Sequence, residues 1–315
     1  MPERALDEQL DQIIDGLLAG ARPAADPELA ALAEIADGLR HLPDESFQKR
    51  LRADLQRRAS MPASTAAPVR EGLRTVTPFI AVPKAAELIE FLKRTLDAEE
   101  TSRHPHGDGF VSALRVGDSD VLIMDFKSGE APSRVGAFHV FVPDCDATYH
   151  RAIQAGGTSL GEPADRPYGE RSGFVKDSVG NYWYIATRFA SNVAPQGAGS
   201  VVPYLHPAKA RPFIDFLKRA FGAEELAVYE HDGRVMHAVA RIGDAVLEMG
   251  ESPDFLASSF YMNVADCDAA YQRAIEAGAT SLWPPTDQVY GERTAGLVDP
   301  FGYQWMPATR IQGAR

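Results

Sequence analysis

The sequence predicts an α+β fold made of two tandem modules, each built from two βαβββ units, behind an N-terminal helical region. An internal repeat is the main observation. Residues 142–188 and 264–310 align at a constant offset of 122 without a gap, and 26 of the 47 positions are identical. Upstream, EFLKRTLDAEE at 90–100 returns as DFLKRAFGAEE at 215–225. Self-similarity at one period means that one folding unit occurs twice.

The second observation is the order of elements within each module. Apolar patterns and turn residues predict a strand, a helix and three further strands, and then the same plan again. The first unit of each module opens with strands at Val76–Val82 and Val201–His206, followed by helices at Ala85–Leu96 and Ala210–Phe221. The second opens with strands at Ala137–Val142 and Ser259–Val264, followed by helices that start near Asp144 or Asp266 and stop at Gly156-Gly157 or Gly278.

These patterns divide the chain into five segments. We expect helices in residues 1–59, a linker at 60–74, modules at 75–190 and 200–310, and a second linker at 191–199. The N-terminal segment carries apolar residues at helical spacing, including Leu6, Leu10 and Ile13. It is either a helical cap on the first module or a docking segment for a protein partner.

Composition excludes several classes of function. The chain has 315 residues and a formal net charge of −12, which argues against nucleic acid as the main partner. No apolar run approaches the roughly 20 residues that a membrane span needs, so we expect no membrane partner. The acidic start lacks the apolar stretch of a signal peptide, and two cysteines, Cys145 and Cys267, make no disulfide framework. We therefore expect a cytoplasmic protein.

Three groups of residues carry a family resemblance. They are the paired βαβββ plans, the YGER loops at Tyr168–Arg171 and Tyr290–Arg293, and the DPFG…W…AT ending at 299–309. Together they resemble the vicinal oxygen chelate superfamily, which includes glyoxalases, bleomycin-resistance proteins and extradiol dioxygenases. VMHA followed by IGD at 235–244 is similar to its PhnB-like branch. The resemblance spans about Thr75 to Arg310 and implies eight-stranded cupped sheets whose concave faces hold a small molecule.

Strand alternation predicts which side chains line the cups. In Ala137–Val142 the even positions are uniformly apolar, so we expect them against the helices, together with Trp183 and Trp305. The mixed faces should line the cavities. For ligand binding they supply Phe79, His139, Phe141, Tyr182 and Tyr184 in the first module, and Tyr204, His206, Tyr261, Asn263, Gln304 and Met306 in the second. Aromatic walls favour a flat or aromatic ligand.

The resemblance also implies where a metal would bind. Metal-dependent members use four inward His, Glu or Gln side chains, and the matching positions here are Thr77, Ile123 (or Met124), Ala137, Tyr184, Val202, Glu248, Ser259 and Met306. Only Glu248 is a usable ligand, whereas a transition-metal site needs three or four. We therefore predict no metal and no cofactor. A metal held by His237, Glu248 and His206 is a lesser alternative.

Glu248 and His237 are the candidate catalytic pair, with His206 as a further partner. A turn at Gly243-Asp244 places Val239 opposite Glu248 and His237 two residues along on the same face. The pair is either a general acid and base, with the pKa of Glu248 raised by desolvation, or a buried structural pair. The corresponding residues of the first module are Val111 and Ile123, so the fold does not require the pair of Glu248 and His237.

The YGER loops are the other repeated polar feature. Arg171 and Arg293 bind a ligand anion, or they form structural ion pairs, which their presence in both copies favours. Arg293 is included among the candidate ligand-binding residues.

Three functions follow from these observations. The first is binding of a flat small molecule without a catalytic metal, and the second is a metal-independent lyase or isomerase. The third is a protein-interaction or regulatory role through residues 1–59. Because Ala81, Val111 and Ile123 stand where the second module has His206, His237 and Glu248, we expect the cup around those three residues to be the working one. Tyr182 and Tyr184 are assigned to the other cup.

Overall fold

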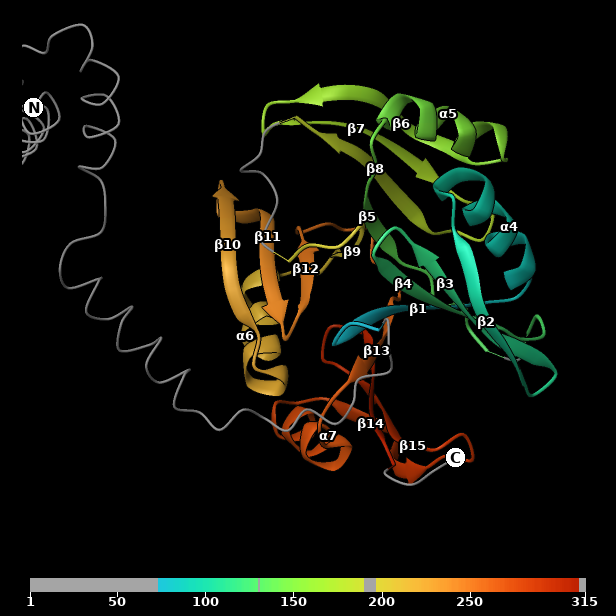
Figure 1. Cartoon of the computed structure of the whole chain (residues 1–315). Helices are drawn as coiled ribbons and strands as arrows, with labels where there is room; N and C mark the ends of the chain where they lie inside the picture. Colours follow the sequence, from blue (N-terminus) through green and yellow to red (C-terminus); the bar gives the residue numbers. More distant parts are fainter. Residues whose placement is uncertain (1–72, 130, 190–196, 312–315) are drawn as a thin grey trace, which may run out of the picture. The chain divides into compact units, whose positions relative to one another are not determined.

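The computed structural model describes residues 73–129, 131–189 and 197–311 as four βαβββ units (Figure 1). The first module contributes unit 1, with β1 (Val76–Val82), α4 (Ala85–Leu96), β2 (Glu99–His106), β3 (Gly109–Val116) and β4 (Ser119–Asp125), and unit 2, with β5 (Ala137–Phe141), α5 (Cys145–Gln154), β6 (Thr158–Arg166), β7 (Glu170–Lys176) and β8 (Tyr182–Arg188). The second contributes unit 3, with β9 (Val201–Leu205), α6 (Ala210–Phe221), β10 (Glu224–His231), β11 (Arg234–Ile242) and β12 (Ala245–Met249), and unit 4, with β13 (Ser259–Asn263), α7 (Cys267–Glu276), β14 (Thr280–Asp287), β15 (Glu292–Val298) and β16 (Gln304–Arg310). The helices expected in residues 1–59 lie outside the described residues.

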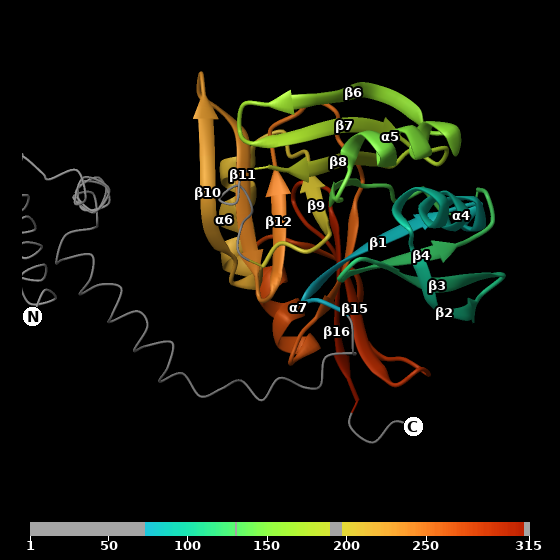
Figure 2. The same ribbon diagram turned by 45° about the horizontal axis from the view of Figure 1, so that its top comes forward.

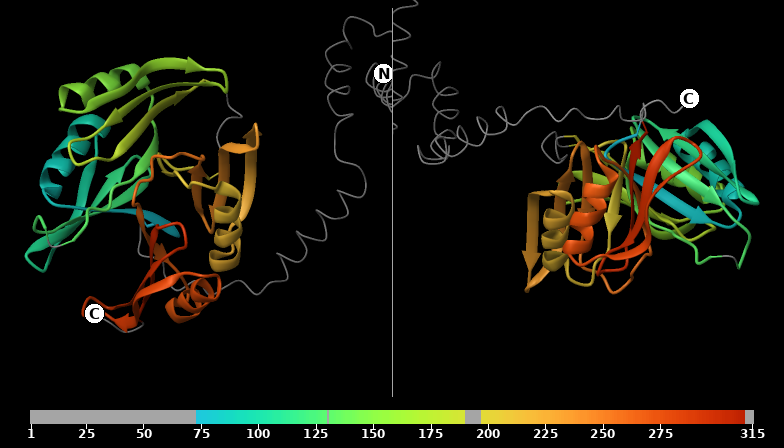
Figure 3. Two further views of the ribbon diagram at one scale, coloured as in Figure 1. Left: turned by 180° about the vertical axis from the view of Figure 1, so that it is seen from behind. Right: turned by 90° about the horizontal axis from the view of Figure 1, so that it is seen from below.

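The two sheets are not formed module by module. Sheet A has the order β14-β15-β16-β13-β1-β4-β3-β2 and therefore joins unit 1 to unit 4. Sheet B has the order β10-β11-β12-β9-β5-β8-β7-β6 and joins unit 2 to unit 3. Antiparallel pairs β1–β13 and β5–β9 make the two central joints. In Figure 3 the red strands of unit 4 accordingly lie beside the blue-green strand β1. Each concave face thus combines residues from both modules.

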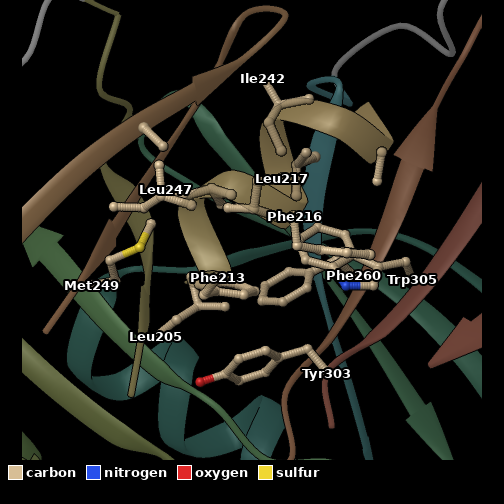
Figure 4. Packing of buried hydrophobic residues seen from close by; sticks show 14 of the residues in the cluster. Leu205, Phe213, Phe216, Leu217, Ile242, Leu247, Met249, Phe260, Tyr303 and Trp305 are labelled. Carbon is tan, nitrogen blue, oxygen red and sulfur yellow. The ribbon is translucent and has the colours of Figure 1, made fainter. Parts of the chain in front are cut away.

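The helix-side cores, in contrast, do follow the modules. Helices α4 and α5 lie side by side over one core, and α6 and α7 over the other (Figures 1 and 2). The first core gathers residues of units 1 and 2, including Phe138, Val140 and Trp183. The second gathers residues of units 3 and 4, and Figure 4 shows Phe213 and Phe216 of α6 packed near Trp305 of β16. Shared helix packing therefore holds each module together, while sheet pairing ties the two modules to each other.

The predicted faces are confirmed at the tryptophans. Trp183 and Trp305 are buried on the helix side, and their indole Nε1 atoms donate to the carboxylates of Asp177 and Asp299 at 2.9 and 2.8 Å. The Asp299 carboxylate also accepts backbone N–H groups from Phe301 and Tyr303. These aspartates of the turns before the last strands are therefore structural, because they satisfy buried donors.

Reciprocal contacts join the two modules at their opening strands. The turn residue Asp244 accepts hydrogen bonds from the backbone N and Oγ1 of Thr75 at 2.7 and 2.6 Å. Its counterpart Asp118 accepts from the backbone N of Ser200 at 2.6 Å. Each module therefore caps the first strand of the other. Among the described residues, no helix is both long and apolar enough to span a bilayer.

Candidate functional site

A cavity of about 400 Å³ opens on the face of sheet B that is opposite the helices, which we call cup B. Five of its lining residues are aromatic, namely Tyr168, Phe174, Tyr182, Tyr184 and Tyr204, and the others are His139, Leu160, Glu170, His206, Met236, Gly250, Glu251 and Ser252. Residues 139–184 come from the first module and residues 204–252 from the second. The corresponding face of sheet A is called cup A.

The aromatic wall is built by strands that meet at the centre of sheet B. The ring of Tyr184 on β8 makes T-shaped contacts with Phe174 on β7 and with Tyr204 on β9, each at 5.2 Å between ring centroids. Burial raises the pKa of both Tyr184 and Tyr204, so their phenols stay neutral. Gly250 is required beside them, because an added Cβ would lie 2.7 Å from the backbone carbonyl oxygen of Met236 and 2.9 Å from the Tyr204 hydroxyl. The assignment of Tyr182 and Tyr184 to a separate cup from His206 and Glu248 is therefore wrong, since the sheet joins their strands.

Glu248 makes its shortest contact with a residue of the other module. Nδ1 of His139 lies 2.8 Å from Oε2 of Glu248, and Nε2 of His139 lies 3.4 Å from Oε1 of Glu170. The predicted neighbours are also present, because Val239 pairs opposite Glu248 and Nε2 of His237 lies 3.6 Å from Oε2 of Glu248. Glu170 and Glu248 are buried and the His139 side chain is 12% exposed, whereas the His237 side chain is 43% exposed.

The charges of this cluster differ from the expectation for a general base. Burial alone would raise the pKa of Glu248, but the charge of His139 and hydrogen bonds from His139 and His237 hold it below its usual range. Burial would likewise lower the pKa of His139, but Glu248 and Glu170 raise it to about 9. At neutral pH the pair is therefore a carboxylate and an imidazolium. The expectation that desolvation raises the pKa of Glu248 is wrong, because the charge of His139 and the hydrogen bonds to the carboxylate outweigh burial.

His206 lies further along the same wall. Its Nε2 is hydrogen-bonded to the hydroxyl of Tyr184 at 3.0 Å. Burial lowers the pKa of His206, so the ring is neutral at pH 7. His206 is thus a cavity-lining residue, but it belongs to the aromatic wall and makes no described contact with Glu248.

Cup A, on sheet A, contains the matching positions with different side chains. Tyr261 replaces His139, Met306 replaces Tyr184, and Phe79 replaces Tyr204. These three side chains pack together with Leu73, Ala113, Leu122 and Ala308 in one apolar cluster on the face of cup A. The hydroxyl of Tyr261 donates to Oε2 of Glu292, the counterpart of Glu170, at 2.5 Å.

The strand pairing shows which residue of the first module corresponds to Glu248. Leu122 pairs with Phe79 and Ala113, just as Glu248 pairs with Tyr204 and Val239. The counterpart of Glu248 is therefore Leu122, and Ile123 belongs to the helix-side core instead. The expected counterpart, Ile123, is wrong by one residue. The β3–β4 hairpin precedes the β11–β12 hairpin by 126 residues, whereas Phe79 precedes Tyr204 by 125. Cup A still has an apolar residue, Leu122, where cup B has the carboxylate of Glu248.

Arg293 does not line a cup. Its guanidinium donates to Asp268 of α7 and to Asp287 of β14, with its shortest distances 2.5 and 2.7 Å. Arg171 makes the same pair of contacts with Asp146 and Asp165. The ligand-binding assignment of Arg293 is therefore wrong and the structural ion pair is confirmed, because the residue before each arginine points into the cup.

The remaining candidates lie in or beside the cups. Phe141 packs with Val202, Val239 and Val246 beneath the cavity of cup B. In cup A, Asn263 donates from Nδ2 to the carbonyl of Arg74, and Gln304 pairs with Ser259. Sequence reasoning missed Glu170, Tyr168, Phe174 and Glu251 as cavity residues. The alternation of β7, which begins within YGER and has Glu170, Ser172 and Phe174 on one face, is the signal that could have found Glu170 and Phe174.

The donor set of cup B does not fit the divalent metal of the superfamily. His139 directs both ring nitrogens at carboxylates of the protein, Nδ1 at Glu248 and Nε2 at Glu170, so neither faces an open position for a metal. Both His139 and His237 contact the same oxygen of Glu248, and His206 is engaged by Tyr184. Within the part of the chain that the structure describes, no group of three or more His, Cys, Asp or Glu side chains is arranged to hold a metal ion.

Comparison with known proteins identifies the family. The family model described as the Glyoxalase/Bleomycin resistance protein/Dioxygenase superfamily matches residues 73–185 and 209–306. An uncharacterised protein of Mycobacterium bovis is 37% identical over 131 residues, which cover 37% of this chain and 84% of that protein. An uncharacterised protein of Mycobacterium tuberculosis is similar at 37% identity, with 75% of its length covered.

Two solved structures share the fold. Glyoxalase I from Zea mays has a TM-score of 0.59 at 15% identity, with 75% of this chain and 92% of that chain covered. A putative dioxygenase from Bacillus subtilis has a TM-score of 0.52 at 15% identity, with 75% and 85% covered. The chain belongs to the glyoxalase/bleomycin resistance protein/dioxygenase superfamily.

Proposed function

We propose that cup B binds a flat, largely aromatic small molecule without a catalytic metal. The observation that supports this proposal is the cavity of about 400 Å³ walled by five aromatic rings. Small-molecule sites typically enclose about 300–1,000 Å³ and combine apolar walls with a few polar groups. Rings at the wall stack on a flat ligand or meet its edge, which adds to the free energy gained by burying its surface.

The matched cup of the same chain supports the choice of cup B. In cup A, Tyr261, Phe79 and Met306 pack against one another and against Leu122, which stands in place of Glu248. Cup B keeps space between rings at the corresponding positions. The proposed ligand site therefore depends on side-chain identity and not on the shared scaffold.

Thermal shift with a library of flat aromatic compounds tests the proposal, because a ligand that binds only the folded state raises the melting temperature. Hits are then titrated against Tyr204→Ala in cup B and against Phe79→Ala, its counterpart in cup A. We expect Tyr204→Ala to weaken binding at least tenfold and Phe79→Ala to leave the Kd unchanged. Equal losses in both variants would contradict the assignment to cup B.

The absence of a catalytic metal is part of the proposal, and elemental analysis tests it. Protein purified without added metal should contain far less than one equivalent of any transition metal. A stoichiometric metal that is lost in Glu248→Gln would contradict a metal-free site and favour the metal-dependent members of the superfamily.

A second candidate function is a metal-independent lyase or isomerase. The observation that favours it is the contact between His139, which lines the cavity, and the buried Glu248. Glu248 and His237 were the expected acid and base, but the lowered pKa of Glu248 makes it a weak base. Turnover of a thermal-shift hit, abolished in His139→Gln while binding persists, would favour this function over simple binding.

Three finer expectations remain predictions. They are the PhnB-like branch, the cytoplasmic location and a protein partner bound through residues 1–59. Capture of a partner by the full chain but not by a variant lacking residues 1–59 would support the last of these.

A further inference from the structure

Glu170 is a nearly buried carboxylate on the wall of cup B that is poorly supplied with hydrogen-bond donors. It lines the cavity, and its side chain is 4% exposed. Among the described residues its one ion pair is with Nε2 of His139 at 3.4 Å, and the geometry leaves that nitrogen without a hydrogen bond. The phenol of Tyr168 also lies nearby, since partial burial and the charge of Glu170 raise its pKa. A carboxylate has about four acceptor sites, so most of the capacity of Glu170 is unused.

The other carboxylates beside the cavity do have donors. Oε2 of Glu248 accepts from Nδ1 of His139 at 2.8 Å. Oε1 of Glu251 accepts from the backbone N of Ala210 at 3.0 Å. Buried polar groups in folded proteins normally carry at least one hydrogen bond, so Glu170 is an exception that calls for a donor from outside the chain.

Cup A shows that the scaffold can supply such a donor from its own residues. There the hydroxyl of Tyr261 donates to Oε2 of Glu292, the counterpart of Glu170, at 2.5 Å. In cup B, His139 stands at the position of Tyr261, but its shortest contact is with Glu248. The same glutamate position is therefore satisfied within the protein in cup A and left open in cup B.

The cations near Glu170 offer no donor to the cavity either. Nε2 of His139 is buried and faces Glu170. Arg188 lies opposite Glu170 in the β7–β8 register, but its guanidinium stacks on the ring of Phe141 at 3.2 Å from the centroid, and its Nε is buried without a described hydrogen bond. These two cations balance the charges of Glu170 and Glu248. The open position therefore requires a hydrogen-bond donor and no net positive charge.

We infer that Glu170 anchors the ligand of cup B by accepting a hydrogen bond from a ring N–H or amino group at the edge of a flat aromatic molecule. The inference rests on the proposed ligand site and names the chemical class of its ligand. The aromatic wall covers the faces of such a molecule, and the carboxylate selects its edge. An isosteric ligand without the donor leaves the buried carboxylate unpaired, and sites built on such a hydrogen bond reject that ligand strongly.

Three bicyclic molecules of nearly equal shape test the inference. Indole carries a ring N–H, benzofuran has an oxygen in its place, and indene has a methylene group. Ligand-observed NMR measures the Kd of each with the wild-type chain. Because hydrogen bonds to charged groups are the stronger ones, we expect the Kd of indole to be at least about tenfold lower than those of benzofuran and indene. The N–H proton of bound indole should also shift downfield, as a hydrogen bond to a carboxylate requires.

Glu170→Gln and its cup A control Glu292→Gln assign the effect to one residue. Glu170→Gln should reduce the preference for indole over indene at least about threefold, because the acceptor loses its charge. An unchanged Kd for indene shows that the cup of this variant is intact. Glu292→Gln should keep the full preference.

Two failures are distinguishable. Equal binding of indole and indene to the wild-type chain, or a full preference in Glu170→Gln, would overturn the role of Glu170 and leave the flat-ligand site in place. If none of the three molecules binds, the flat-ligand site fails and this inference fails with it.

Discussion

Nδ1 of His139 lies 2.8 Å from Oε2 of Glu248, although the two residues are 109 positions apart and belong to different modules. The contact exists because β5 pairs with β9, which places unit 2 and unit 3 in one sheet. Glu248 was expected to be the one usable metal ligand of its cup, but it forms an ion pair with His139. The properties expected of this site follow from that pairing.

Removal of one partner should destabilise the fold more than removal of both. Glu248→Leu leaves the imidazolium of His139 with only its longer contact to Glu170, at 3.4 Å, and should lower the free energy of unfolding by about 3 kcal/mol. The double variant His139→Tyr/Glu248→Leu, which has the residues of cup A, should recover most of that loss. Urea unfolding at pH 7 measures both. A double variant less stable than Glu248→Leu alone would contradict the expectation that the residues of cup A are compatible with cup B.

Stability should also depend on pH through His139. Its folded pKa of about 9 exceeds its usual value of 6.5, so its stabilising charge is fully present below pH 6.5 and is lost as the pH rises through 9. Relative to the double variant, the wild-type free energy of unfolding should fall by at most about 3 kcal/mol over that range. Glu248 contributes in the opposite direction, because its pKa is lowered and its stabilising charge is lost only as the pH falls into the acid range. Urea titrations at half-unit pH steps check the slope, and a flat difference between pH 6.5 and 9 would contradict it.

Tyr184 should matter for ligand binding although it belongs to the first module. Tyr184→Met installs the residue of cup A and removes both the ring contact with Tyr204 and the hydrogen bond to His206. We expect the Kd of a cup B ligand to rise about tenfold, because an aromatic contact contributes about 1 kcal/mol beyond its buried area. Met306→Leu is the matched control in cup A and should leave the Kd unchanged. Isothermal titration calorimetry measures both variants.

The contacts between modules should be separable from the ligand site. Asp244→Asn weakens the bonds from the backbone and hydroxyl of Thr75, and we expect a loss of about 1 kcal/mol in unfolding free energy. Asp232→Asn, at an exposed hairpin tip, is the control and should change little. Ligand affinity should be the same in both variants. A large change in affinity for Asp244→Asn would show that sheet pairing and ligand binding are coupled.

Local patterns in the sequence predicted much of the fold. The helix bounds of α4 and α6, the buried tryptophans and the pairing of Val239 with Glu248 all follow from apolar spacing and turn residues. Such signals report which face of an element is buried. The helix-side faces were therefore predictable, because each module covers them with its own helices.

The composition of the site was not predictable in the same way. The pairing of β5 with β9 depends on contacts between modules, and the repeat is equally compatible with sheets closed within a module. His139 could not be assigned to Glu248 without that pairing, and the pKa of Glu248 was consequently expected to shift in the wrong direction. Glu170 was overlooked because YGER was treated as a loop, whereas β7 begins at Glu170.

Methyl NMR of two methionines tests the central claim that cup B holds the ligand. Met236 lines the cavity of cup B, and Met306 belongs to the apolar cluster of cup A. With 13C-labelled methionine methyl groups, a flat aromatic ligand should shift the Met236 resonance through its ring current and leave Met306 unmoved. A shift confined to Met306, with Met236 unchanged at saturation, would contradict the account.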